Sequence, residues 1–65
     1  MVMVNGKARE LPENATISEL LELMGCQANQ VVAEHNGRMV SRESFRETAV
    51  KDGDTVEIIS FMGGG

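Results

Sequence analysis

The sequence contains no tryptophan or tyrosine, one proline and one cysteine, and these scarcities exclude several kinds of site. The single cysteine, Cys26, has no partner for an internal disulfide and cannot by itself build a zinc site or an iron–sulfur cluster. Basic residues are also scarce, with six Lys and Arg against ten Asp and Glu and a formal net charge of -4. A chain without a basic patch is a poor ligand for nucleic acid, so a basic protein surface is the expected counterpart.

Length and composition indicate one small domain of 65 residues. Hydrophobic residues make up 42% of the chain but aromatic residues only 3%, so an aliphatic core leaves little room for a buried polar catalytic cluster. His35 has no His or Cys at ligand spacing, and we predict no metal site. The apolar start, Met1 to Val4, is too short for a signal peptide or a membrane span. We therefore predict a cytoplasmic protein that does not bind membranes.

The C-terminus is the most informative stretch. The run Thr55–Met62 is rich in Val, Ile and Thr, which predicts a strand within a sheet. Gly63, Gly64 and Gly65 follow directly. Because glycine loses the most entropy on ordering, we expect these residues to form a flexible tail. We predict a folded domain over residues 1–62 and a tail over residues 63–65.

This tail is thin enough to enter the active site of another protein. Four residues from Met62 onward span about 13 to 14 Å when extended, and glycines pass through channels too narrow for other residues. They would deliver the α-carboxylate of Gly65, which is ionised at neutral pH. A carboxylate is a poor acyl donor until it is activated. The plain alternative is that the glycines are a frayed end or a piece of linker.

The rest of the sequence predicts two hairpins and one helix around the final strand. Asn5-Gly6 and Asn36-Gly37 each lie between extended segments, which is the strongest short hairpin signal because both turn positions need positive φ. Thr16 and Glu19 predict a capping box at the start of a helix, and Gly25 predicts its end. The apolar residues that share one face of this helix are Ile17, Leu20, Leu21 and Met24.

A single helix covers only one face of a sheet, so the other face is expected to meet solvent. Along the last strand, Glu57 belongs in water, which turns Ile59 and Phe61 outward with it. The same reasoning turns Val32 and Glu34 outward on the strand over residues 30–34. We therefore predict a partner-docking surface. It consists of Val32, Ile59, Phe61 and Met62. The alternative is that a loop or a second copy of the chain buries this face.

The capped helix, Asn36-Gly37, Arg42, the stretch Lys51–Asp54 and the strand that ends in three glycines resemble the sulfur carriers of thiamine biosynthesis. These are ubiquitin-like proteins, and the resemblance covers the whole chain. It departs from the family at Ser41, where a Pro often precedes the Arg. The resemblance implies an α+β fold of the β-grasp type, a mixed sheet with one main helix packed on one face.

The resemblance also implies a function. In that family an ATP-using adenylyltransferase, similar to ubiquitin-activating enzymes, converts the terminal carboxylate, here of Gly65, into an acyl-adenylate. A sulfur donor protein then leaves a thiocarboxylate on this residue, and the carrier docks on thiazole synthase and donates the sulfur. The implied protein is a recyclable substrate, not an enzyme. It has no catalytic residue and no bound cofactor, and ATP is used by the activating enzyme.

Three alternatives share parts of this pattern. The small subunit of molybdopterin synthase is similar in fold, tail and chemistry, although its chains tend to be longer. A protein modifier that is conjugated to lysine through Gly65 needs the same tail. A β-grasp binding module with an inert tail belongs to a different class and involves no covalent chemistry.

Overall fold

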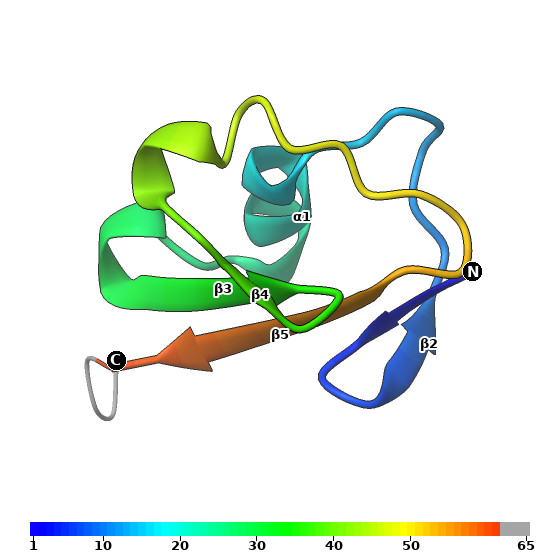
Figure 1. Cartoon of the computed structure of the whole chain (residues 1–65), viewed down its shortest axis with the longest axis horizontal. Coiled ribbons are helices and arrows are strands. Elements are labelled where there is room, and N and C mark those ends of the chain that lie inside the picture. Colours follow the sequence, from blue (N-terminus) through cyan, green and yellow to red (C-terminus); the bar gives the residue numbers. More distant parts are fainter. Residues whose placement is uncertain (62–65) are drawn as a thin grey trace.

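The computed structural model describes residues 1–61, which form one five-stranded sheet with a helix on one of its faces (Figure 1). The elements are β1 (Val2–Val4), β2 (Lys7–Arg9), α1 (Ile17–Met24), β3 (Val31–His35), β4 (Arg38–Val40) and β5 (Thr55–Ser60), with 3₁₀ turns η1 (Ala28–Gln30) and η2 (Arg42–Ser44). Across the sheet the strand order is β2-β1-β5-β3-β4. Because β5 runs parallel to β1 and antiparallel to β3, the sheet is mixed, as predicted.

Both Asn-Gly pairs form the predicted tight turns. Asn5 and Asn36 each have a φ of +52°, and Gly6 and Gly37 have φ values of +81° and +85°. Positive φ at both central positions is the geometry that joins two twisted antiparallel strands with only two residues. The turns fix the register, with Val4 opposite Lys7 in the first hairpin and His35 opposite Arg38 in the second.

The two turn asparagines also hold the central strand. The side chain of Asn5 accepts a hydrogen bond from the Ile58 N–H at 2.8 Å and donates to the Ile58 carbonyl at 3.2 Å. Asn36 accepts from the Thr55 N–H at 2.8 Å. Each side-chain amide therefore pairs with the backbone of β5 just beyond the end of a neighbouring strand. These contacts help to fix the position of β5 in the sheet.

Helix α1 begins and ends where the sequence predicts. The Glu19 N–H donates to the Thr16 hydroxyl at 3.2 Å, and the Thr16 N–H donates to the Glu19 carboxylate at 2.9 Å, which completes the capping box. Gly25 ends the helix with a φ of +74°. Its N–H donates to the Glu22 carbonyl at 3.1 Å. Two turns of helix are marginal alone in water, so packing on the sheet has to stabilise α1.

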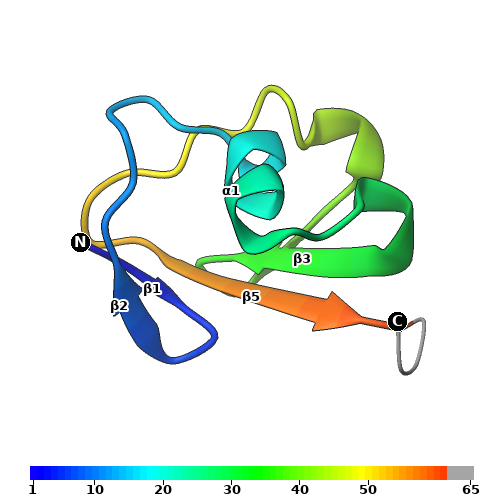
Figure 2. The same ribbon diagram turned by 180° about the vertical axis from the view of Figure 1, so that it is seen from behind.

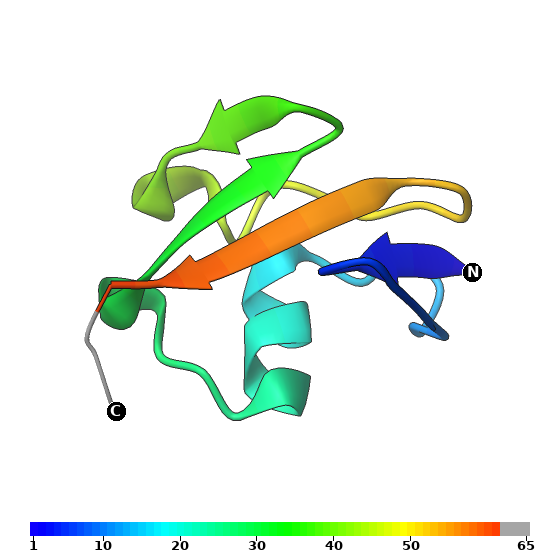
Figure 3. The same ribbon diagram turned by 90° about the horizontal axis from the view of Figure 1, so that it is seen from below.

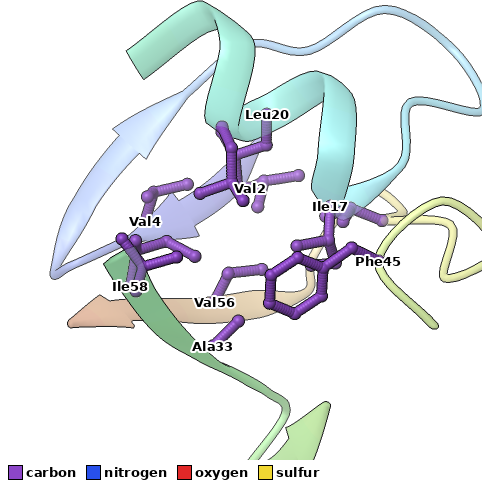
Figure 4. Packing of buried hydrophobic residues seen from close by; sticks show 11 residues of the cluster. Val2, Val4, Ile17, Leu20, Ala33, Phe45, Val56 and Ile58 are labelled. Carbon is purple, nitrogen blue, oxygen red and sulfur yellow. The ribbon is translucent and has the colours of Figure 1, made fainter. Parts of the chain in front are cut away.

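The core lies between α1 and one face of the sheet (Figures 2 and 4). Ile17 and Leu20 point from the helix toward the strands, and Val56 and Ala33 point back from the centre of the sheet. Phe45, which follows η2, fills the side of this core and is only 2% exposed. The other buried members of the cluster are Val2, Val4, Leu21, Val31, Val50 and Ile58. Among residues 1–61 no polar or charged residue is buried.

The connection from β4 to β5 closes over the start of the helix. The Ile17 N–H donates to the Thr48 carbonyl at 3.0 Å, and the Val50 N–H donates to the Ala15 carbonyl at 2.7 Å. These bonds occupy backbone groups at the helix start, where intrahelical partners are lacking. Two features were not predicted, namely η1 before β3 and the end of β5 at Ser60 instead of Met62. No helix in the described part of the chain is long and apolar enough to span a membrane.

Candidate functional site: an open sheet face at the end of β5

The face of the sheet opposite α1 carries the predicted apolar residues. Along β5, Val56 and Ile58 are buried, whereas Ile59 is 49% exposed and Phe61, just beyond the strand, is 58% exposed. Val32 lies directly opposite Ile59 in the β3–β5 ladder and is half-buried. We call Val32, Ile59 and Phe61 the open-face patch. The structure brings these three together as the sequence predicted, since Val32 pairs with Ile59 and lines one groove with Phe61. Helix α1 lies on the other side of the sheet (Figure 3).

Two methionines extend the exposed apolar surface, and the sequence reasoning missed them. Met39 lies opposite Glu34 in the β3–β4 ladder and is 63% exposed. Met3, between the buried residues Val2 and Val4, is 38% exposed. Strict alternation along each short strand, with valines pointing to the core, is the signal by which both were predictable.

Two carboxylates lie side by side at the border of the patch. Glu34 and Glu57 face each other across the β3–β5 ladder, two pairs along from Val32 and Ile59 and therefore on the same face of the sheet. Like charges in directly opposite positions destabilise a strand pair. A basic side chain from another protein placed between them would relieve this repulsion, so the arrangement favours a cationic partner.

The end of β5 is anchored to the fold. Although the strand ends at Ser60, the Phe61 N–H still donates to the Gln30 carbonyl at 3.1 Å. This hydrogen bond holds Phe61, the last described residue and a member of the open-face patch, next to the start of β3. The predicted docking residue Met62, the tail residues Gly63 and Gly64 and the predicted modified residue Gly65 lie outside the described residues, as does the predicted boundary between domain and tail.

The opposite end of the sheet holds a polar cluster around Asp54. Its carboxylate accepts hydrogen bonds from the Lys51 N–H at 2.8 Å and from the Asn36 amide at 3.2 Å, and it contacts the His35 ring at 2.7 Å. The backbone hydrogen bond from Lys51, followed by the contact with His35, lowers the pKa of Asp54 from 3.8 to about 2. The cluster lies at the start of β5, away from the patch, and joins β3 to the turn before β5.

The described residues offer no metal site. Within residues 1–61, no group of three or more His, Cys, Asp or Glu side chains is arranged to hold a metal ion. Cys26 is a free, half-buried thiol, packed against the core cluster after the helix end. The candidate site of the described residues is the open-face patch, at the end of β5.

Comparisons with known proteins agree with this geometry. The family model of the ThiS family matches residues 2–65. The whole chain is 32% identical to the whole of the sulfur carrier protein ThiS from Bacillus subtilis and 35% identical to the whole of the protein of that name from Thermus thermophilus. Over 98% of its length it is 36% identical to a thiazole synthase from Paramagnetospirillum magneticum, of which it spans only 20%.

A solved structure is also similar to this chain. The crystal structure of a thiamine biosynthesis protein (ThiS) from Geobacter metallireducens superposes with a TM-score of 0.82 at 45% identity, over 98% of this chain and 97% of that one. This likeness confirms the predicted β-grasp fold. Because the family model covers almost the entire sequence and two relatives match from end to end, the chain belongs to the ThiS family.

Proposed function

We propose that the chain is a sulfur carrier of thiamine biosynthesis, a small carrier protein and not an enzyme. The observation that carries this proposal is its end-to-end similarity to two proteins named sulfur carrier protein ThiS. The fold agrees with it, since the described residues present an exposed apolar face and bury no polar group. The predicted cytoplasmic location stays a prediction.

The proposed chemistry takes place on Gly65. An ATP-dependent adenylyltransferase binds the carrier, the Gly65 carboxylate attacks the α-phosphorus of ATP, and pyrophosphate leaves. A hydrosulfide equivalent from a sulfur donor protein then attacks the acyl carbon and displaces AMP, which leaves a thiocarboxylate. The carrier itself supplies no acid, base or cofactor. Its contribution is to bring the terminus to each partner at high local concentration.

The proposed docking surface is the open-face patch together with Met62. Ile59 and Phe61 offer the exposed apolar area that anchors an interface, while Glu34 and Glu57 at its border favour basic residues on the partner. Thiazole synthase is one proposed partner, because a protein of that name contains a stretch similar to this whole chain. The adenylyltransferase is the other.

The covalent chemistry is tested by intact mass. We expect that incubation with the adenylyltransferase, ATP and sulfide replaces one oxygen of the chain by sulfur, and that fragmentation places the change on Gly65. A chain that ends at Gly63 is the matched control, because it keeps the whole described fold. It should fold normally and acquire no sulfur. An unchanged mass of the full chain with an active enzyme would falsify the carrier assignment.

The docking surface is tested separately by binding. Ile59→Asp should weaken binding to thiazole synthase at least tenfold, because it places a third acid beside Glu34 and Glu57 and removes an anchor. Leu23→Asp is the matched control, since Leu23 is similarly exposed, at 54%, but lies on α1. Equal effects of the two substitutions would show that the open-face patch is not the docking surface.

The same experiments separate the remaining alternatives. A non-covalent binding module would keep its partner binding and its role in the cell when Gly64 and Gly65 are removed. A protein modifier would appear as a product linked to lysine through Gly65. The family match and the curated relatives favour the thiamine carrier over the small subunit of molybdopterin synthase.

A further inference from the structure

The outer edge of β4 has main-chain groups available for a further strand. β4 is the last strand of the sheet, and no strand of the described residues lies on its outer side. In a hairpin with a two-residue turn, the residues that flank the turn form a hydrogen-bonded pair, and the next pair does not. His35 and Arg38 flank the turn, and Ala33 and Val40 pair two residues further on. Met39, which lies between them, therefore directs its N–H and C=O outward.

Two grooves run together along this edge. One, of about 480 Å³, is largely apolar and extends past Val32, Phe45 and Phe61. The other, of about 390 Å³, extends past His35 and Thr48. Both are lined by Met39, Val40 and Ser41, so the two grooves adjoin each other along β4, and together we call them the channel. Val32 and Phe61, at its far end, also belong to the open-face patch. An extended segment beside Met39 would place its side chains in this channel.

The charge along the channel is opposite to that of the chain as a whole. Arg38 lines one groove and Arg42 lines the other, and no Asp or Glu lines either of them. Residues 35–51 contain four Lys and Arg and two Asp and Glu, whereas the entire chain carries a net charge of -4. Glu34 lies opposite Met39 on the open face. Glu43 lies in η2, and Glu47 follows it. The ring of His35 is engaged with Asp54.

We propose that the edge of β4 binds an extended acidic segment of a partner protein by adding it to the sheet as a sixth strand. The Met39 N–H and C=O pair with the main chain of the segment. Arg38 and Arg42 pair with its carboxylates, and an apolar side chain occupies the groove beside Phe61. Main-chain pairing supplies affinity in this mode of recognition, and side-chain pockets supply specificity. The proposal does not depend on the carrier chemistry, which uses the terminal glycines.

The test uses a synthetic octapeptide with alternating Glu and Val, titrated into the isotope-labelled chain and followed by NMR. We expect the largest backbone amide shift and the strongest slowing of hydrogen exchange at Met39. Arg38→Glu and Arg42→Glu should each weaken binding about tenfold or more, whereas Lys7→Glu, on the opposite edge strand, should not. Added salt should weaken binding to the wild type.

The controls make the proposal falsifiable even if a variant unfolds. A peptide N-methylated at every residue keeps its carboxylates and side chains but has no main-chain N–H to donate, so it cannot complete the strand pairing and should not bind. Equal binding of this peptide, shifts centred on Ile59 without Met39, or no binding at millimolar peptide would overturn the proposal. So would Met39 shifts that depend on protein concentration alone, because a second copy would then be the occupant. A last control uses no peptide. If removal of residues 62–65 alone then abolishes the Met39 shift or its slowed hydrogen exchange, the chain's own terminus occupies the edge, and this result would also overturn the proposal.

Discussion

Ile58 and Ile59 are adjacent isoleucines on one strand, and truncating each of them to alanine should have very different effects on stability. Ile58 is 7% exposed and belongs to the core under α1, whereas Ile59 is 49% exposed on the opposite face. Truncation of a buried isoleucine to alanine costs about 2 to 5 kcal/mol. A chain of 65 residues has a free energy of unfolding of about 3 to 10 kcal/mol in total, at about 0.05 to 0.15 kcal/mol per residue. Ile58→Ala should therefore remove a large part of the stability.

Ile59→Ala should cost about 1 kcal/mol or less. Only about half of its side chain is removed from water, and a cross-strand contact with Val32 contributes about 0.2 to 1 kcal/mol. The same substitution should weaken docking to thiazole synthase, where truncation of a central interface anchor costs about 2 kcal/mol or more. Ile58→Ala thus tests how much the core contributes to stability, and Ile59→Ala tests how much the open face contributes to binding.

Urea unfolding followed by far-UV circular dichroism measures the two stabilities, since the chain has no Trp or Tyr to report by fluorescence. The midpoint should fall strongly for Ile58→Ala and slightly for Ile59→Ala, while the slope with urea stays constant. Equal losses of stability, or a larger loss for Ile59→Ala, would refute the assignment of the two faces of the sheet.

Three further predictions concern the polar contacts of the fold. Because the pKa of Asp54 is lowered in the folded state from 3.8 to about 2, its contribution to stability is nearly complete above about pH 5 and is lost as the pH falls toward 2. The difference in unfolding free energy between the wild type and Asp54→Asn should therefore be about 1 to 2 kcal/mol at pH 6 and shrink by pH 2.5; a constant difference contradicts this. Thr16→Ala should cost about 1 kcal/mol in thermal unfolding through loss of the capping box, and an unchanged Tm contradicts it. Asn5→Gly keeps positive φ accessible but removes both hydrogen bonds to Ile58, so it should cost about 1 to 3 kcal/mol, and an unchanged stability would show that the amide contacts do not matter. Asn5→Ala should cost more, because alanine also strains the positive φ, and the reverse order would show that this φ does not matter.

The sequence predicted the local elements because each has a short-range chemical signal. Asn-Gly specifies a two-residue turn. At the helix start, the side chains of Thr16 and Glu19 each accept a hydrogen bond from the other residue's backbone N–H. At the helix end, Gly25 adopts the left-handed conformation. The face of β5 was predictable because Glu57 is disfavoured in an aliphatic core. That single residue orients Ile59 and Phe61 by alternation.

Contacts between distant segments were not predictable in the same way. Nothing in the sequence near β1 indicates that it runs parallel to β5, and the contact between His35 and Asp54 joins residues 19 positions apart. Alternation could have turned Met39 outward, but its place opposite Glu34, next to the open-face patch, follows only from the pairing of β4 with β3. Such features depend on how the whole chain packs, which no local pattern encodes.

The central claim is that sulfur leaves this protein from Gly65, and isotope transfer tests it most directly. The chain should be converted to its thiocarboxylate with heavy sulfur, purified free of sulfide, and supplied to thiazole synthase with the remaining substrates of that enzyme. The proposed function predicts that the heavy isotope appears in the thiazole product and that the chain returns to a carboxylate at Gly65. A product that carries only unlabelled sulfur, while the label stays on the protein, would contradict it.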